Sequence, residues 1–263
     1  MQTTSHLLMI QPLRFGFNPE TAVNNAFQVA GASGTAQETA LKEFNDFVQV
    51  LRKEGVDITV VADTAEPHTP DSIFPNNWVS FHEDGTVVLY PMFAPNRRQE
   101  RKPAVLATIG SKFRIERKID LSVYESSNAF LEGTGSMVLD REKKIAYACI
   151  SPRTDFEVLT DFCEKMQYQA VVFDAFDQQL RPIYHTNVMM CVADKYVVIC
   201  LESIPSDTER EDLISSITGS GKEIIPISLE QMNRFAGNML QVQNEKGEKL
   251  LVMSSAAYCS LTA

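Results

Sequence analysis

The stretch "YHTNVMMCV", residues 184–192, places a histidine and an amide directly before an apolar run. Residues 188–192 have the composition of a buried strand, and turn residues follow them. Histidine titrates near neutral pH, and an amide both donates and accepts hydrogen bonds. His185 and Asn187 therefore either have only a structural role at the start of a strand or belong to a catalytic or binding site.

A cysteine and a glutamate elsewhere in the chain could complete such a site. Cys259 lies in "SSAAYCSL", whose composition indicates a loop and favours a nucleophile over a small buried hydrophobe. Glu132 lies in the apolar stretch "NAFLEGTG", where an acid is costly unless it is paired. Together with His185 they indicate nucleophilic catalysis, in which the thiolate attacks, the imidazole transfers protons and the carboxylate orients the imidazole.

The bulk composition limits the classes of function. The chain has 263 residues, of which 44% are hydrophobic, and its net charge of −10 argues against a nucleic-acid partner. No apolar run approaches the roughly 18 residues of a membrane span, and we expect no signal peptide. Five cysteines without a CxxC pair indicate free thiols and a cytoplasmic protein. The histidines show no metal-ligand spacing, so we expect no metal and no cofactor.

A repeat in the turns predicts how these residues are positioned. Four hairpins, each with two strand-like runs around a turn, recur along the chain. Their turns fall at Asp84, Asp140, Asp194 and Glu245, so the intervals are 56, 54 and 51 residues. A hairpin that recurs at a near-constant interval indicates a structural repeat.

Each complete repeat continues with a helix and a third strand, which makes the unit strand-strand-helix-strand. The N-terminus supplies a partial copy, with strands at 6–12 and 56–63 around an amphipathic helix at 37–53. The last unit is incomplete where the sequence stops at Ala263. We therefore expect an α/β fold in a single domain over 1–263, a five-bladed propeller around a pseudo-five-fold axis. The other helices are expected at 97–109, 155–166 and 208–217, and the third strands at 112–116, 169–173 and 223–227.

The unusual polar residues fall at equivalent positions of the repeat. A hairpin brings the start of its first strand beside the end of its second, so in a ring of like units these residues should converge on one mouth. Asn77, Asn187 and Asn238 each stand seven residues before a turn acid, which leaves open that these amides only begin strands. The residues expected at the mouth are Asn77, Arg98, Glu132, Arg153, His185, Asn187 and Cys259.

In these residues the chain resembles the guanidino-group-modifying enzymes, or pentein superfamily, over essentially its whole length. It looks most similar to the branch called citrulline utilisation hydrolases. The resemblance implies a five-bladed α/β propeller with a catalytic cysteine, histidine and glutamate, here Cys259 in "AAYCSL", His185 in "YHTN" and Glu132 in "FLEGTG". It also implies arginines that bind the substrate carboxylate. These fall on Arg97 or Arg98 in "NRRQE" and on Arg153 in "SPRTD".

The departures from the family pattern concern charge. Deiminases of this superfamily typically carry aspartates in F-x-R-D and H-x-D stretches, where this chain has "FPNN" and "HTN". Gly135 also replaces the aspartate of E-G-G-D. The carboxylates that would clamp a cationic guanidinium are thus the amides of Asn77 and Asn187, which suit a neutral ureido group. We expect hydrolysis of citrulline to ornithine, ammonia and carbon dioxide through a covalent intermediate on Cys259.

Two alternatives stay open at this point. An arginine deiminase, dimethylarginine hydrolase or amidinotransferase would use the same catalytic residues on a guanidino group. A non-catalytic binding propeller would not need a cysteine, a histidine and a glutamate at one mouth. The expected partner is a small amino-acid substrate, with no nucleic acid and no membrane, and a homodimer is one assembly such a chain could form.

Overall fold

The computed structural model describes residues 1–25, 27–28 and 36–261, and the chain divides into two compact units. Unit 1 consists of Met1–Thr3, Ala129–Val242 and Lys249–Ala263. Unit 2 consists of Thr4–Asn128 and Gln243–Glu248. No helix in the described part of the chain is long and apolar enough to cross a membrane.

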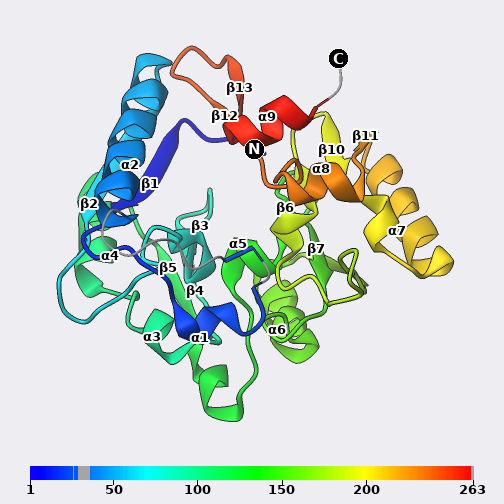
Figure 1. Ribbon diagram of the computed structural model, residues 1–263, viewed down its shortest axis with the longest axis horizontal. Coiled ribbons are helices and arrows are strands. Elements are labelled where there is room, and N and C mark those ends of the chain that lie inside the picture. Colours follow the sequence, from blue (N-terminus) through cyan, green and yellow to red (C-terminus); the bar gives the residue numbers. More distant parts are fainter. Residues whose placement is uncertain (26, 29–35, 262–263) are drawn as a thin grey trace. The chain divides into compact units, whose positions relative to one another are not determined.

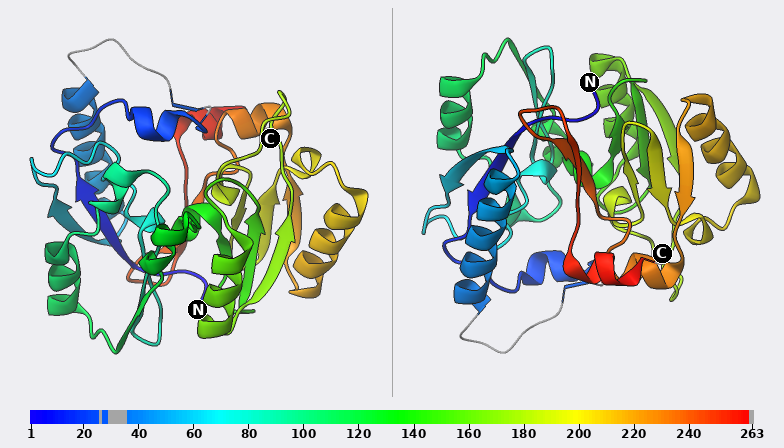
Figure 2. Two further views of the ribbon diagram at one scale, coloured as in Figure 1. Left: turned by 90° about the horizontal axis from the view of Figure 1, so that it is seen from below. Right: turned by 90° about the horizontal axis from the view of Figure 1, so that it is seen from above.

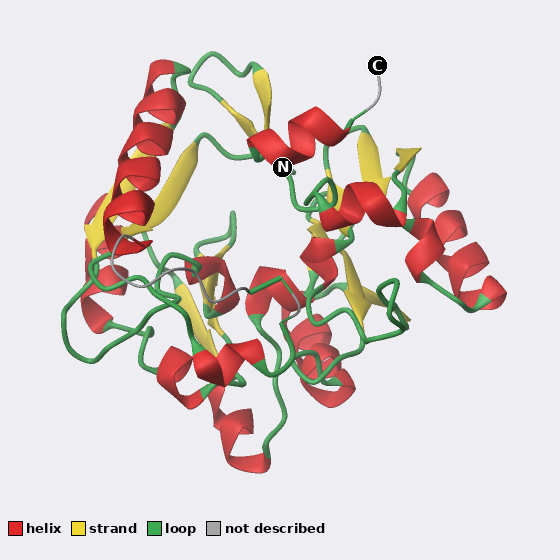
Figure 3. Ribbon diagram, viewed as in Figure 1, coloured by secondary structure: helices red, strands yellow, loops and turns green. Residues whose placement is uncertain are grey.

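Within the described residues, three three-stranded sheets follow the predicted repeat (Figures 1 and 3). In each of them an antiparallel hairpin is extended by a third strand that runs parallel to the second. The strand-strand-helix-strand unit is thereby confirmed. The sheets are β3 (Val79–Phe81), β4 (Thr86–Leu89) and β5 (Arg117–Asp120) in unit 2, and β6 (Val138–Asp140), β7 (Ile145–Cys149) and β8 (Gln169–Phe173), then β9 (Met190–Val192), β10 (Tyr196–Ile199) and β11 (Glu223–Pro226), in unit 1.

Two further sheets have two strands each. In unit 2, β1 (His6–Gln11) pairs in parallel with β2 (Asp57–Ala62), and α2 (Ala36–Lys53) packs on β2. This is the partial repeat expected from the N-terminal sequence. The second of these sheets pairs β12 (Leu240–Gln243) with β13 (Lys249–Val252).

The helices cover the sheets and end at recognisable signals. Asp155 caps α6 (Phe156–Met166) by accepting the backbone N–H of Glu157, and Ser206 caps α7 (Asp207–Gly219) in the same way. Figure 2 shows α7 beside β11, and α7 also contacts β8. The remaining helical elements are α1 (Pro19–Ala22), η1 (Pro75–Asn77), α3 (Pro95–Arg98), α4 (Pro103–Lys112), η2 (Ser122–Ser127), α5 (Gly133–Ser136), η3 (Thr186–Val188), η4 (Leu201–Ser203), α8 (Leu229–Asn233) and α9 (Ser255–Ser260).

Three predicted elements differ from the structure. The helix expected over 97–109 is interrupted between α3 and α4, because the residue before Pro103 is driven out of the helical region. The strand expected over 112–116 begins later, at Arg117, because α4 continues to Lys112 and Ile119 is the strand residue that is buried. The loop expected around Cys259 is the helix α9, which Ser254 caps by accepting the N–H of Ala257 at 3.1 Å.

Each unit has its own buried apolar residues. In unit 2, Trp78 lies in a cluster with strand residues such as Ile10, Val79 and Leu89. In unit 1, Phe162 of α6, Tyr147 of β7 and Phe173 of β8 are buried. The short first strands are anchored as well, because Val79 of β3, Leu139 of β6 and Met190 of β9 are buried. The polar residues directly before them are consequently held in defined positions.

Candidate active site

A glutamate and a histidine from two different repeats meet in the interior of unit 1. His185 Nε2 lies 2.8 Å from Glu132 Oε2. Glu132 is fully buried, and His185 is 5% exposed. When the carboxylate is ionised it can only accept, and Nε2 then donates the hydrogen of this bond. The structure therefore brings together the two residues to which the sequence assigned proton transfer and its orientation.

Arg153 contacts the same carboxylate oxygen as His185. Its NH1 is 3.4 Å from Glu132 Oε2, and both side chains are almost completely buried. The guanidinium also lies over the ring of Tyr184, 4.9 Å from its centroid, and that ring is 4.7 Å from the ring of His185. A buried charge is tolerated only when it is paired, and Arg153 supplies the pairing for Glu132.

The backbone around Glu132 is fixed by short polar contacts. Gly133 follows with φ +46°, a left-handed conformation that favours glycine, and α5 starts there. Ser136 Oγ accepts the N–H of Glu132 at 2.9 Å and donates to the carbonyl of Arg153 at 2.6 Å. The "GTGS" sequence thus forms a compact turn that locks Glu132 to the segment carrying Arg153.

Threonine and serine side chains hold the histidine segment in the same way. Thr186 Oγ1 donates to the carbonyl of Ser136 and accepts the N–H of Cys149 at 2.9 Å. Ser151 Oγ donates to the carbonyl of Tyr184 at 2.8 Å. Thr186, Ser136 and Ser151 are supporting residues that the sequence motifs do not single out. The signal available was their position beside His185, Glu132 and Arg153, because hydroxyl side chains bond nearby backbone groups.

Asn187 is the middle residue of η3 and is half-buried. Its backbone carbonyl accepts from Asn238 Nδ2 at 2.9 Å, whereas its own side-chain amide bonds no residue in the described ranges. Asn187 and Asn238 therefore have different functions in the structure, although both begin strands. Asn238 supports the backbone of η3, and the Asn187 amide is available to a ligand.

Gly237 packs against the same segment. A Cβ on Gly237 would lie 2.7 Å from the carbonyl carbon and 2.9 Å from the Cα of Met189, and would also meet the carbonyl oxygen of Val188. Backbone atoms cannot yield as a flexible side chain does, so Gly237→Ala is expected to lower the free energy of unfolding by about 1–3 kcal/mol. Denaturant unfolding measures this. Gly219→Ala, where the Cβ meets no atom within 4 Å and the backbone is helical, is the control and should be at least as stable as wild type.

In unit 2, Asn77 ends η1 and is buried. Its Oδ1 accepts from Arg97 NH1 at 2.8 Å, and Arg97 in turn bonds both oxygens of Glu100. Arg98, the next residue, donates through Nε to the carbonyl of Met92 at 3.0 Å and through NH2 to that of Phe93. The two neighbouring arginines thus have different partners, and Arg97 is the one that contacts Asn77.

Cys259 is the exposed member of the five free cysteines. It lies on α9, beside α8 and apart from α5 in Figure 1, and it makes no hydrogen bond to Glu132 or His185. Its pocket measures about 710 Å³. The convergence of Cys259 with the Glu132–His185 pair, expected from the repeat, is not among the contacts of the described residues. The residues that line the pocket are Ser228, Glu230, Gln231, Arg234, Ser255, Ala256, Cys259 and Ser260.

The other four thiols are poor nucleophiles. Burial raises the pKa of Cys149 to about 12, and it raises the pKa of Cys163, Cys191 and Cys200 to about 11. At neutral pH these groups are almost entirely protonated. Because the thiolate is the reactive form, the four buried cysteines are expected to be inert.

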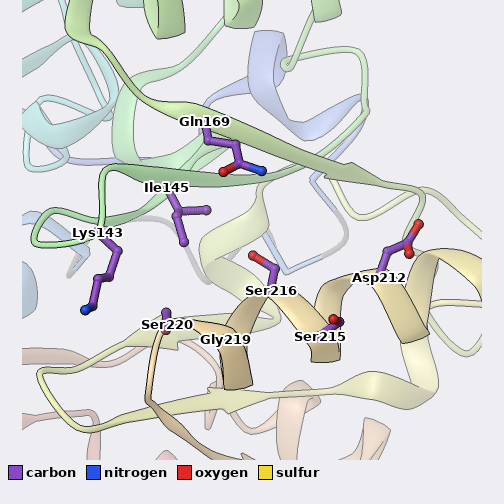
Figure 4. Close-up of a pocket in the computed structure, with 8 residues that line it drawn as sticks. All are labelled: Lys143, Ile145, Gln169, Asp212, Ser215, Ser216, Gly219 and Ser220. Atoms are coloured by element: carbon purple, nitrogen blue, oxygen red, sulfur yellow. The ribbon is translucent and has the colours of Figure 1, made fainter.

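A second pocket in unit 1 contains none of the candidate residues. It measures about 420 Å³ and lies between α7 and the strands β7 and β8. Figure 4 shows Gln169 and Ile145 on the strand side and the serines of α7 on the other. Within the described part of the chain, no group of three or more His, Cys, Asp or Glu side chains could hold a metal ion.

The comparison with protein families gives a match over almost the whole chain. A family described as N,N dimethylarginine dimethylhydrolase, eukaryotic, matches residues 11–263. No curated protein sequence matches the chain significantly.

Solved structures with this fold include three relevant proteins. ArgZ, an arginine dihydrolase from the ornithine-ammonia cycle in cyanobacteria, is 19% identical with a TM-score of 0.68 over 90% of this chain. AgrE, in a complex with ornithine and NAD+, is 18% identical with a TM-score of 0.69 over 90% of this chain. DDAH from Pseudomonas aeruginosa, a cysteine-to-serine variant in complex with citrulline, is 15% identical with a TM-score of 0.60 over 91% of this chain.

These structures differ in length from the present chain. It spans about a third of ArgZ and of AgrE, at 33% and 32%, and 81% of DDAH. The N-terminal domain of ArgZ, solved with substrate bound, is matched over 80% of its length. At these identities the likeness establishes the fold.

Proposed function

This chain belongs to the N,N dimethylarginine dimethylhydrolase family and hence to the pentein superfamily, and on that premise we propose that it hydrolyses a C–N bond of a ureido amino acid. The proposed reaction converts citrulline to ornithine, ammonia and carbon dioxide. The observation that carries the proposal is the buried hydrogen bond between His185 and Glu132, at 2.8 Å. A carboxylate bonded to one ring nitrogen fixes the orientation of an imidazole, and general acid–base catalysis requires a positioned side chain of this kind.

The proposed mechanism has two stages. The Cys259 thiolate attacks the ureido carbon, and the bond to the side-chain nitrogen breaks as His185 protonates the leaving amine. Ornithine leaves, and a carbamoyl thioester remains on Cys259. Water that gives its proton to His185 then cleaves the thioester, and the carbamate decomposes to ammonia and carbon dioxide.

The other candidate residues are assigned to substrate binding. Asn77 and Asn187 hold the ureido group, because amides match a neutral group that both donates and accepts. Arg153, with Arg97 or Arg98, is assigned to the substrate carboxylate, because a guanidinium binds a carboxylate through two donors. In the proposed assembly the five sheets are the blades of one propeller domain over residues 1–263. The free thiols fit a cytoplasmic location.

The family membership favours a second candidate function, the hydrolysis of a guanidino group. The family description concerns dimethylarginine, and ArgZ is an arginine dihydrolase. A guanidinium would meet two amides here instead of two carboxylates. It would therefore lose two charge-assisted hydrogen bonds, each worth about 1.5–3 kcal/mol. This is the reason to prefer the ureido substrate.

One assay separates the candidates. The purified protein is offered citrulline, arginine, agmatine and dimethylarginine, and ornithine, citrulline and ammonia are measured. We expect ornithine and ammonia from citrulline, with arginine left largely intact. Citrulline formed from dimethylarginine, or ornithine from arginine at a higher rate than from citrulline, would favour guanidino hydrolysis.

Cys259 is expected to be alkylated first among the five cysteines. It is exposed, whereas burial raises the pKa of the other four thiols. Mass mapping after brief treatment with iodoacetamide measures this, and saturating citrulline should slow the reaction at Cys259. Cys259→Ser should abolish turnover while leaving the unfolding curve unchanged. A Cys259→Ser protein that keeps its activity would remove the nucleophile from this assignment.

A further inference from the structure

Arg97 holds the side-chain amide of Asn77 in one orientation. Its NH1 donates to Asn77 Oδ1 at 2.8 Å, and its NH2 donates to the carbonyl of Phe74 at 3.3 Å. A guanidinium carries only donors, so it can bind only the oxygen end of an amide. With the amide turned over, the Nδ2 of Asn77 and the NH1 of Arg97 would be two donors facing each other.

Glu100 in turn fixes Arg97. Its Oε1 accepts from Nε at 2.9 Å and its Oε2 accepts from NH2 at 3.0 Å. The side chain of Arg97 is 3% exposed and that of Glu100 is 0% exposed. A buried bidentate pair of this kind restricts the guanidinium to one geometry. The orientation of the Asn77 amide is therefore set within unit 2, before a ligand binds.

The part of Asn77 that remains for a ligand is a donor. Its Nδ2 makes no hydrogen bond to any residue of 1–25, 27–28 or 36–261. A group recognised by Nδ2 must present an acceptor atom. The carbonyl oxygen of a ureido group is such an acceptor, whereas a guanidinium has donors only.

We propose that Arg97 is a positioning residue that turns Asn77 into an obligate donor and thereby selects a ureido group over a guanidinium. This inference rests on the proposed function and deepens it. It assigns to Arg97 the orientation of the Asn77 amide. The preference for a ureido group then depends on the direction of one hydrogen bond. If the Asn77 amide could rotate by 180°, it could present its oxygen to a guanidinium or its nitrogen to a ureido oxygen.

The test is a double-mutant cycle on the citrulline-to-arginine ratio of kcat/KM. Removing Arg97 alone would leave Glu100 buried without its partner, so both are replaced together as Arg97→Met with Glu100→Met. We expect this replacement to lower the ratio about 10-fold, as Asn77→Ala does, because each removes the same oriented donor. Asn77→Ala made in the Arg97/Glu100 background should then lower the ratio by less than about two-fold more.

A second buried ion pair provides the control. Lys222 Nζ lies 3.1 Å from Asp140 Oδ2 in unit 1, with the side chains 2% and 0% exposed. Lys222→Met with Asp140→Leu is expected to change the melting temperature and leave the ratio as in wild type. This comparison separates the loss of a buried ion pair from the loss of an oriented amide.

Each outcome decides the inference. If the two sets of changes lower the ratio additively, Arg97 does not act through Asn77, and the proposed function stands without it. If wild type uses no ureido substrate, both the function and the inference are overturned. Should the double methionine variant fail to fold, Glu100→Gln keeps the shape and one acceptor oxygen. It is expected to lower the ratio about three-fold, and an unchanged ratio there would count against the inference.

Discussion

His185→Ala is expected to lower kcat for citrulline by about 10²- to 10⁴-fold, the contribution of a positioned acid–base group. The imidazole would protonate the leaving amine and later accept a proton from water, so both stages lose their proton carrier. Its replacement leaves Glu132 paired with Arg153. The fold is therefore expected to persist. Release of ornithine and ammonia measures the rate, and circular dichroism measures the fold.

An exposed histidine–carboxylate pair offers a matched control for this change. His6 Nδ1 lies 3.0 Å from Asp57 Oδ2, with the side chains 50% and 38% exposed. His6→Ala should leave kcat within about two-fold of wild type, because exposed pairs contribute little. If His185→Ala keeps wild-type activity, His185 is a structural residue and the catalytic proposal is wrong.

Converting both amides to acids, as Asn77→Asp with Asn187→Asp, is expected to lower the citrulline-to-arginine ratio of kcat/KM by about 100-fold or more. The two sites contribute for different reasons. An Asp at 77 would face Arg97 and lose the donor that the ureido oxygen needs. An Asp at 187 would place a charge where the Asn187 amide has no partner in the described part of the chain. Each lost or mismatched hydrogen bond contributes about 1–3 kcal/mol.

The alternative explanation of the amides, that they only begin strands, predicts a different result. In that case each single change would lower the stability and leave the ratio as in wild type. Asn238→Asp tests this directly, because Asn238 bonds the backbone carbonyl of Asn187. We expect it to reduce the melting temperature and to leave the ratio unchanged. A double variant with an unchanged ratio, or a wild type that prefers arginine, would contradict the ureido assignment.

Local signals in the sequence were sufficient to predict most elements. The third strand over 169–173 coincides with β8, and the helix over 155–166 differs from α6 only by its capping residue. Turn residues, strand-like runs and N-caps act within a few residues of each other, so they can be recognised without knowledge of the packing. The errors at α3, α4 and β5 arose where a proline and the burial of Ile119 set the boundaries.

The sequence by itself also determined which residue types could carry the chemistry. A glutamate in an apolar stretch must find a partner, and Glu132 is bonded by His185 and Arg153. The sequence also shows directly that Asn77 and Asn187 stand where the family pattern has two aspartates. The hydrogen bonds that Glu132, Asn77 and Asn187 need follow from their residue types and their immediate neighbours in the sequence.

Only the tertiary structure decided the partners. It joined Arg97 to Asn77 across 20 positions and Glu132 to His185 across 53, and it placed the hydroxyls of Ser136 and Thr186 between the segments. It also put Cys259 on a helix beside α8, where the sequence indicated a loop. Partners of this kind depend on distances between segments remote in the chain. Those distances are set by how the sheets and helices pack, which no local pattern contains.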